Sequence, residues 1–171
     1  HEPFGGRTLV RTLVCEWADK VVCISNSVKD NVLGSKPCSK VQIIYNPLIT
    51  NYFDQPWSAS VARTQLGLPE DSFIVGLPGT LRPVKGHVFF IDAAANILTH
   101  NRNFHFAISG RFDNDYGHSL QERCITLGIT DNIHFVGSVD DMRVFYSACD
   151  VVCVPSRGEP FGRTVIEAFA Q

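Results

Sequence analysis

The pattern of apolar and polar positions predicts an alternation of strands and helices from residue 71 onwards. Short apolar runs, typical of strands buried on both faces, alternate with helix-length segments that repeat apolar residues every three or four positions. The expected strands cover 72–79, 104–110, 132–137 and 150–156, and the expected helices cover 86–98, 116–128, 140–149 and 162–170. The helix over 86–98 has an apolar stripe of Val88, Ile91, Ala95 and Leu98. This order predicts βαβ units and a parallel sheet with helices on both faces, a doubly wound, Rossmann-like α/β domain.

The pattern before residue 71 is less regular. Helical spacing predicts a helix within 6–20, and an apolar run predicts a strand over 21–25. A short helix over 26–34 ends at Gly34, and a second strand over 40–47 is stopped by Pro47. Between 47 and 70 the pattern is lost, so we expect a linker with one weak helix.

Composition narrows the function classes. The chain has 171 residues, 44% of them hydrophobic, which is enough for one full domain. Its net charge of −2 gives no broad basic field of the kind found in nucleic-acid-binding proteins. No apolar run approaches the roughly 20 residues that a membrane helix needs. The six cysteines form no CxxC pair, which favours reduced, mostly buried thiols and a cytoplasmic protein over surface disulfides. The chain lacks an initiator Met and its last helix lacks a closing cap, so we expect a piece of a longer protein.

Candidate chemistry lies after the strands, because ligands of doubly wound sheets bind at the carboxyl ends of the strands. The loop 79–86 carries Arg82 and Lys85, whose charges suit a phosphate but also suit plain solvent exposure. This loop is neither a P-loop nor a GxGxxG fingerprint. After the second strand, Gly110 allows either a close backbone approach to a ligand or simply a turn. After the third, Asp140 is expected to cap a helix, and the backbone of 136–139, beginning with Val136, is a candidate reader of a base edge.

The stretch SRGEPFGRTVIEAFAQ carries the strongest local signal. Glu159 and Glu167 have seven residues between them, and Gly162 opens the helix on which Glu167 lies. The first amides of that helix suit a phosphate, which the backbone of four consecutive residues would hold: Phe161, Gly162, Arg163 and Thr164. Each carboxylate could accept a pair of sugar hydroxyls. A nucleotide-sugar would satisfy all three groups; alternatively, Glu159 is solvated and Glu167 merely lies on an exposed helix face.

This stretch resembles the E-x7-E motif of the family-4 (group 1) glycosyltransferases, which have the GT-B fold. The sequences KG at 85–86, ISG before Arg111, IHFVG and YSACDVVCVPSRGE are similar to the C-terminal domain of that family, in the right order. ADKVVCISNSVKDNV and VQIIYNPLITNYFD resemble the end of its N-terminal domain and the crossover. By this resemblance, 1–46 is the C-terminal part of the N-terminal acceptor domain, 47–70 the interdomain linker, and 71–171 the C-terminal nucleotide-sugar-binding domain, truncated at its end.

The resemblance implies transfer of a sugar from a nucleotide-sugar donor to a carbohydrate, lipid or other hydroxyl acceptor, with retention and without a metal or other cofactor. By position, Lys85 would neutralise the departing diphosphate, Glu159 would contact the donor sugar and Glu167 the ribose, while the Phe161 and Gly162 amides would hold phosphate oxygens. The fragment alone would be inactive, and any peripheral membrane contact would come through the missing N-terminal domain.

One position departs from the family pattern. Thr80 stands where the family commonly has an arginine, and Arg82, three residues before Lys85, either substitutes for it or does not. His1 is a candidate for the histidine of the N-terminal domain that faces the donor sugar. A non-catalytic nucleotide-sugar-binding module and a GT-B sugar-nucleotide epimerase are the alternatives, and a Rossmann dehydrogenase lacks its glycine fingerprint here.

Overall fold

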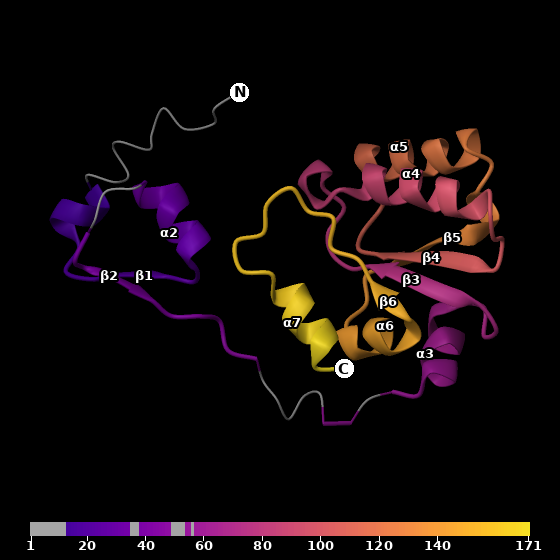
Figure 1. Ribbon diagram of the computed structural model, residues 1–171, viewed down its shortest axis with the longest axis horizontal. Helices are drawn as coiled ribbons and strands as arrows, with labels where there is room; N and C mark the ends of the chain where they lie inside the picture. The colour runs from indigo at the N-terminus through magenta and orange to yellow at the C-terminus, as the bar shows by residue number, and fades with distance from the viewer. Residues whose placement is uncertain (1–12, 35–37, 49–53, 56) are drawn as a thin grey trace. The chain divides into compact units, whose positions relative to one another are not determined.

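The computed structural model describes residues 13–34, 38–48, 54–55 and 57–171 (Figure 1). The chain divides into two compact units, one formed by 1–48 with 159–163 and the other by 49–158 with 164–171. Each unit has its own parallel strands. The candidate His1 and the first part of the helix expected within 6–20 lie outside the described residues.

The larger unit is built on four parallel strands. They are β3 (Phe73–Leu77), β4 (Phe104–Ser109), β5 (Ile133–Gly137) and β6 (Val151–Val152), in the order β5-β4-β3-β6. The register pairs Val75 with Phe106 on one side and with Val151 on the other. The strand order reverses between β3 and β6, and this switch point is where doubly wound sheets bind ligands. The parallel, doubly wound prediction is therefore confirmed.

One face of this sheet is covered by α4 (His87–Leu98) and α5 (Asp115–Thr126), which Figure 1 shows together above the strands. Strand residues that point to this face pack with the two helices into one core: Val75, Leu77, Phe106 and Ile108 meet Phe90, Ile91, Ala94, Leu98, Leu120 and Cys124. In α4, Ile91 and Leu98 are fully buried as the stripe predicts, whereas Val88 and Ala95 are only partly buried. Phe90 and Ala94 replace them in the core, since the true buried face is rotated by part of a turn.

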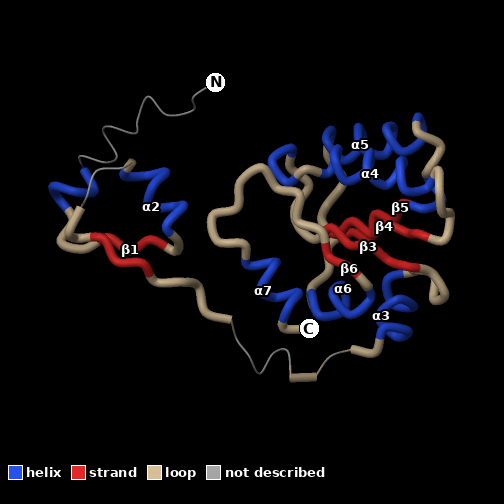
Figure 2. The backbone as a smooth tube through the Cα atoms, viewed as in Figure 1, coloured by secondary structure: helices blue, strands red, loops and turns tan. Residues whose placement is uncertain are grey.

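The other face is covered by α3 (Ala59–Leu66) and α6 (Met142–Ala148), shown below the red strands in Figure 2. Asp141 caps α6, because its side chain accepts a hydrogen bond from the Arg143 N–H at 3.1 Å. The expectation that Asp140 is the cap is wrong by one residue. Two aspartates in tandem satisfy the same sequence signal, and only the backbone decides which one lies at the helix start.

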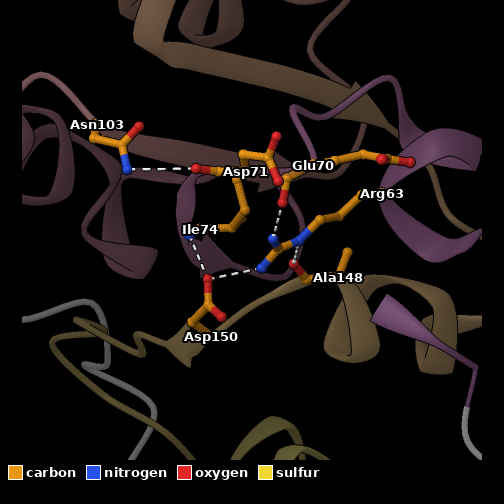
Figure 3. Close-up of polar contacts among 7 residues, drawn as sticks. All are labelled: Arg63, Glu70, Asp71, Ile74, Asn103, Ala148 and Asp150. Carbon is orange, nitrogen blue, oxygen red and sulfur yellow. Dashed lines mark hydrogen bonds and ion pairs between the residues drawn. The ribbon is translucent and has the colours of Figure 1, made fainter. Parts of the chain in front are cut away.

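Helix α3 is fixed to this sheet by a buried arginine (Figure 3). Arg63 donates from Nε to the Ala148 carbonyl at 3.0 Å and from Nη1 to the Glu70 carbonyl at 2.6 Å. Its Nη2 lies 2.8 Å from Asp150 Oδ2, which also accepts the Ile74 N–H at 2.6 Å. The weak helix expected in the 47–70 linker is thus a capped helix docked on the four-stranded sheet of the larger unit.

The smaller unit contains a two-stranded parallel ladder, β1 (Val21–Cys23) and β2 (Val41–Ile43), with α2 (Asn26–Leu33). Ser25 caps α2 by accepting the Val28 N–H at 3.1 Å, and Gly34 ends it with φ +66°, as expected. Of the helix expected within 6–20, the described part is a short π-helical turn, Leu13–Trp17. Both strands are shorter than predicted.

Two remaining expectations concern the cysteines and the membrane. All six cysteines lie in the described part of the chain, and none is in a disulfide. Among the described residues, no helix combines the length and apolar character needed to cross a membrane.

Candidate functional site

The loops that follow β3, β4 and β5 surround a hollow of about 500 Å³ at the carboxyl ends of the strands. We call it the three-loop hollow, and it is lined by Thr80, Leu81, Arg82, Gly110, Arg111, Asp113, Asn114 and Ser138. The structure thereby brings together three residues that sequence singled out for donor binding: Thr80, Arg82 and Gly110. Val136, another of these donor-binding candidates, is half-buried near the end of β5 and does not line the hollow itself.

Backbone contacts hold the three loops against one another. The Gly79 N–H donates to Ser109 Oγ at 3.3 Å, and the Gly110 N–H donates to the Gly137 carbonyl at 2.7 Å. Gly110 has φ +127°, and a Cβ there would lie 2.3 Å from the Gly79 oxygen. Only glycine fits this close approach. The neighbour in this close approach is another loop of the chain, so the two interpretations that the sequence left open for Gly110, an approach to a ligand or a turn, both stay predictions.

The charge around the hollow is mainly positive. Arg82 is exposed, and Arg111 forms a 2.9 Å ion pair with Asp113. The hydrogen bond from Arg111 lowers the pKa of the fully exposed Asp113 carboxyl, and the same contact raises the pKa of Arg111. Arg111 had no assigned role in the sequence analysis. Its position directly after Gly110, in the loop after the second strand of the sheet, was the available signal.

Lys85 lies beside the switch point. It ends the 3₁₀ turn Pro83–Lys85, and Gly86, with φ +79°, leads into α4. The Val84 carbonyl accepts the Arg157 N–H at 2.9 Å, and a Cβ on Gly86 would lie 2.3 Å from the Pro155 oxygen. The loops after β3 and β6 are therefore in direct backbone contact where the strand order reverses.

His87 follows this turn and is completely buried. Burial lowers the pKa of its imidazole, and the charge of Lys85 acts in the same direction. A neutral histidine is therefore expected under the loop that carries Lys85. Sequence reasoning missed this residue because helical spacing alone gives His87 no special place.

The E-x7-E stretch is divided between the two units. Glu167 lies on α7 (Arg163–Phe169) in the larger unit, and the Tyr146 hydroxyl donates to its Oε2 at 2.8 Å. Glu167 is half-buried, so the interpretation of a merely solvated glutamate does not describe it. Tyr146 is, after Arg111 and His87, a third residue that sequence reasoning missed, because positions 146 and 167 are brought together only by packing of α6 and α7.

The residues before α7 belong to the smaller unit. Ser25 Oγ donates to the Pro160 carbonyl, and the Phe161 and Tyr45 rings are tilted at 30° with centroids 5.9 Å apart. Gly162 has φ +78° and is followed directly by the helix, as the sequence predicts. Since Glu159 and Glu167 fall in different units, their shared grip on one ligand stays a prediction.

A metal centre has no obvious ligands in the described residues. Across 13–34, 38–48, 54–55 and 57–171, no three side chains of His, Cys, Asp or Glu come together in a way that could hold an ion. The sheet edge carries two arginines, a lysine and glycine amides, groups that suit anions, beside Asp113, which is paired with Arg111.

The strand order, the switch-point contact and the cationic loops are together typical of the ligand-binding edge of a doubly wound α/β domain. The chain belongs to the group 1 glycosyl transferases, whose family model matches residues 59–171. Its architecture is that of the GT-B glycosyltransferases, and it corresponds to their C-terminal domain. The family and fold that the sequence resemblance implied are confirmed.

Two curated relatives and one solved structure illustrate the similarity. A glycosyltransferase of Methanocaldococcus jannaschii is 33% identical over 88% of this chain and 40% of its own. The lipopolysaccharide core biosynthesis mannosyltransferase LpsB of Rhizobium meliloti is 30% identical over 75% of this chain and 37% of its own. The crystal structure of Anabaena HepE in complex with UDP and glucose matches with a TM-score of 0.84 and 27% identity, covering 96% of this chain and 45% of HepE. The chain thus spans about two fifths of the length of these curated relatives.

Proposed function

We propose that the protein transfers a sugar from a nucleotide-sugar donor to an acceptor hydroxyl, with retention at the anomeric carbon and without a metal ion. Membership of the group 1 family and the UDP complexes of HepE support this. The observation that carries the proposal is the three-loop hollow, because it places two arginines and glycine backbone at the sheet edge that binds ligands in this architecture. The names of several relatives suggest polysaccharide or glycoconjugate biosynthesis as the setting.

Lys85 has the central electrostatic role in this proposal. Cleavage of the glycosidic bond builds negative charge on the leaving diphosphate, and a fixed cation there stabilises the transition state more than the ground state. Without a metal, side chains and helix-end amides must stabilise this negative charge. Removing one such group typically costs about 10²–10³ in rate.

Arg82 supplies a second cation where the usual arginine is absent. Thr80 and Arg82 line the same hollow, so the charge lost at residue 80 is present two positions further along the loop. Arg82 is exposed on that wall and therefore accessible to a solvated anion. We assign the nucleotide phosphates to this side of the hollow and the base to the backbone near Val136.

The E-x7-E residues complete the donor site in the proposal. Glu167, held by Tyr146, takes the ribose diol, and Glu159 takes hydroxyls of the donor sugar. The amides at the start of α7 take phosphate oxygens: Phe161, Gly162, Arg163 and Thr164 supply them. The acceptor is a carbohydrate, lipid or other hydroxyl compound, and the protein works in the cytoplasm with at most peripheral membrane contact.

A binding panel tests the donor class. The chain is mixed with UDP-, GDP-, ADP-, CDP- and dTDP-sugars and their diphosphates, and its melting temperature is recorded, because a ligand that binds only the folded state raises it. We expect one nucleotide to raise the melting temperature and Arg82→Ala to reduce that rise. Arg102→Ala is the matched control, since Arg102 is exposed in the turn before β4, at the opposite end of the strands. No rise with any nucleotide would contradict the proposal.

Turnover separates an enzyme from a binding module. Donor hydrolysis by the full-length gene product is measured with and without Lys85→Ala, and the variant should lose about 10²–10³ in rate while keeping most of its nucleotide affinity. Donor binding without hydrolysis or transfer in the unaltered protein would favour the non-catalytic module. Unchanged turnover in the variant would remove Lys85 from the mechanism.

A further inference from the structure

The loop after β6 contacts both sequence neighbours of Lys85. Val84, on one side, accepts the Arg157 N–H at 2.9 Å through its carbonyl oxygen. Gly86, on the other side, has no room for a Cβ because the Pro155 oxygen would lie 2.3 Å from it. The backbone of Lys85 is thus bracketed by a loop that follows it by about 70 residues in the sequence. Its place at the switch point is set by that loop.

The side chain of Arg157 adds a third contact to this bracket. Its guanidinium carbon lies 4.9 Å from the centroid of the Phe89 ring, within the distance of a cation–π interaction. Phe89 is in the first turn of α4 and is 50% exposed, so the ring is not part of the core. An exposed aromatic ring covered by an arginine from a neighbouring loop is explained by neither core packing nor the donor contacts proposed above.

We propose that Arg157 and Phe89 form a positioning pair that fixes Lys85 relative to the loop after β6. The hydrogen bond to Val84 sets the distance between the two loops, and the stacked guanidinium prevents the loop after β6 from sliding along α4. Arg157 is not among the residues that line the three-loop hollow, so the role proposed for it is that of a positioning residue. This role rests on the proposed function, because it assumes that Lys85 faces a diphosphate.

The pair also connects the two ends of the donor site through the chain. Arg157 is two residues before Glu159, so the segment that it holds leads directly into the E-x7-E motif. A loop free to move by an ångström would displace Lys85. Such small displacements are costly when a charge must lie within a hydrogen-bond length of a phosphate oxygen.

The experiment compares a nucleoside diphosphate with its monophosphate. The tightest binder among UDP, GDP, ADP, CDP and dTDP is titrated into the isotope-labelled chain by NMR, which measures millimolar affinities, and the corresponding monophosphate is titrated in parallel. Arg157→Ala should weaken diphosphate binding about two- to fivefold, the size of an exposed cation–π interaction, and change monophosphate binding by less than twofold. Arg157→Lys should recover part of the loss, and Phe89→Leu should reproduce it without adding to it in the double variant.

Two further variants keep the test sharp. Arg157→Pro also removes the N–H donated to Val84, so it should exceed the alanine effect; its melting temperature shows whether the fold survives. Arg102→Ala is the matched control, because it removes an exposed arginine in the turn before β4, at the opposite end of the strands from the bracket. An equal loss for mono- and diphosphate in Arg157→Ala, or no loss at all, overturns the positioning role and leaves the proposed function intact. An unaltered chain that binds none of the diphosphates overturns both.

Discussion

The Tyr146 hydroxyl donates a hydrogen bond to Glu167 Oε2 at 2.8 Å, joining α6 to α7 through the second acidic residue of the E-x7-E motif. Tyr146 is almost fully buried and Glu167 half-buried, so the contact is protected from solvent. The glutamate therefore enters any complex with one oxygen already engaged by the protein. Its orientation is set by α6, which is packed on the sheet.

Removing that hydroxyl should weaken the domain. Tyr146→Phe is expected to lower the free energy of unfolding by about 1–2 kcal/mol, since a hydrogen bond to a charged acceptor is lost with the ring kept in place. Urea denaturation followed by fluorescence measures it. Tyr116→Phe is the matched control, because the Tyr116 hydroxyl is buried and has no hydrogen-bond partner within the described part of the chain. That change should be neutral or slightly stabilising, and equal losses in the two variants would contradict the assignment.

Arg63 should be among the most sensitive polar residues of the domain. Arg63→Ala is expected to cost about 3 kcal/mol, because it leaves the Asp150 carboxylate and two carbonyls without their shared donor. Arg63→Lys should be intermediate, since an ammonium cannot reach three divergent acceptors. Arg123→Ala, which breaks an exposed ion pair with Asp92, should cost at most about 1 kcal/mol. Comparable losses at positions 63 and 123 in thermal unfolding would show that α3 is not anchored as described.

Acidification should destabilise the sheet at two facing histidines. His105 Nδ1 and His134 Nε2 lie 2.8 Å apart on β4 and β5, a distance that requires one shared proton. Burial lowers the pKa of both imidazoles, and for His134 the charge of His105 adds to the effect. Because each folded-state pKa lies below the ordinary value of 6.5, their contribution to stability is complete above that pH and is lost as the pH falls below it.

Melting temperatures between pH 7.5 and 5 check this sign, and the slope should flatten in His134→Gln. The same change at exposed His118 controls for the loss of a histidine as such. An unaltered slope in His134→Gln would assign the acid sensitivity to another group, of which the buried His87 is the first candidate.

A comparison of two glycines with similar backbone angles separates the cost of a left-handed backbone from the cost of a steric clash at Cβ. Gly86 and Gly128 have φ +79° and +65°, but only at Gly86 would a Cβ meet a neighbour, the Pro155 oxygen at 2.3 Å. Gly128→Ala should cost about 1–2 kcal/mol for the left-handed conformation alone. Gly86→Ala should exceed it by at least about 1 kcal/mol and also weaken diphosphate binding, because the loop that carries Lys85 must move. Equal unfolding free energies for the two variants would show that the loops are not in contact there.

The order of strands and helices could be predicted because it is written in local apolar periodicity, and the ends of α2 and α4 follow from Gly34 and Gly86. Contacts between distant segments carry no such signal. The docking of α3 depends on Arg63 meeting Asp150, and a single arginine in an irregular stretch does not reveal a partner so far along the chain. The choice between Asp140 and Asp141 as cap failed for a different reason, since both have the same local preference.

The sequence predicts which loops form the site, but it predicts less well which side chains contact one another there. Residues 80, 82 and 110 were expected at one sheet edge and lie around one hollow, because parallel topology forces the carboxyl ends together. The roles of Tyr146 and Arg157 depend on side chains packed across elements, which periodicity does not encode. The apolar run over 150–156 predicts a longer strand than is found, since β6 pairs with β3 only through Val151 and Val152.

The position of β3 between β4 and β6 also determines the order in which the three-loop hollow and the bracket around Lys85 form during folding. β3, β4 and β5 pair with strands that are near in the sequence, whereas the pairing of β3 with β6, Val75 with Val151, joins segments far apart in the sequence. Closing long loops costs entropy before contacts repay it, so distant pairings form late. On the ribosome, the nascent chain can therefore form the hollow around Arg82 once β3, β4 and β5 have emerged. The bracket around Lys85 also needs β6 and the loop that follows it to have left the exit tunnel. The bracket around Lys85 would therefore form after the hollow.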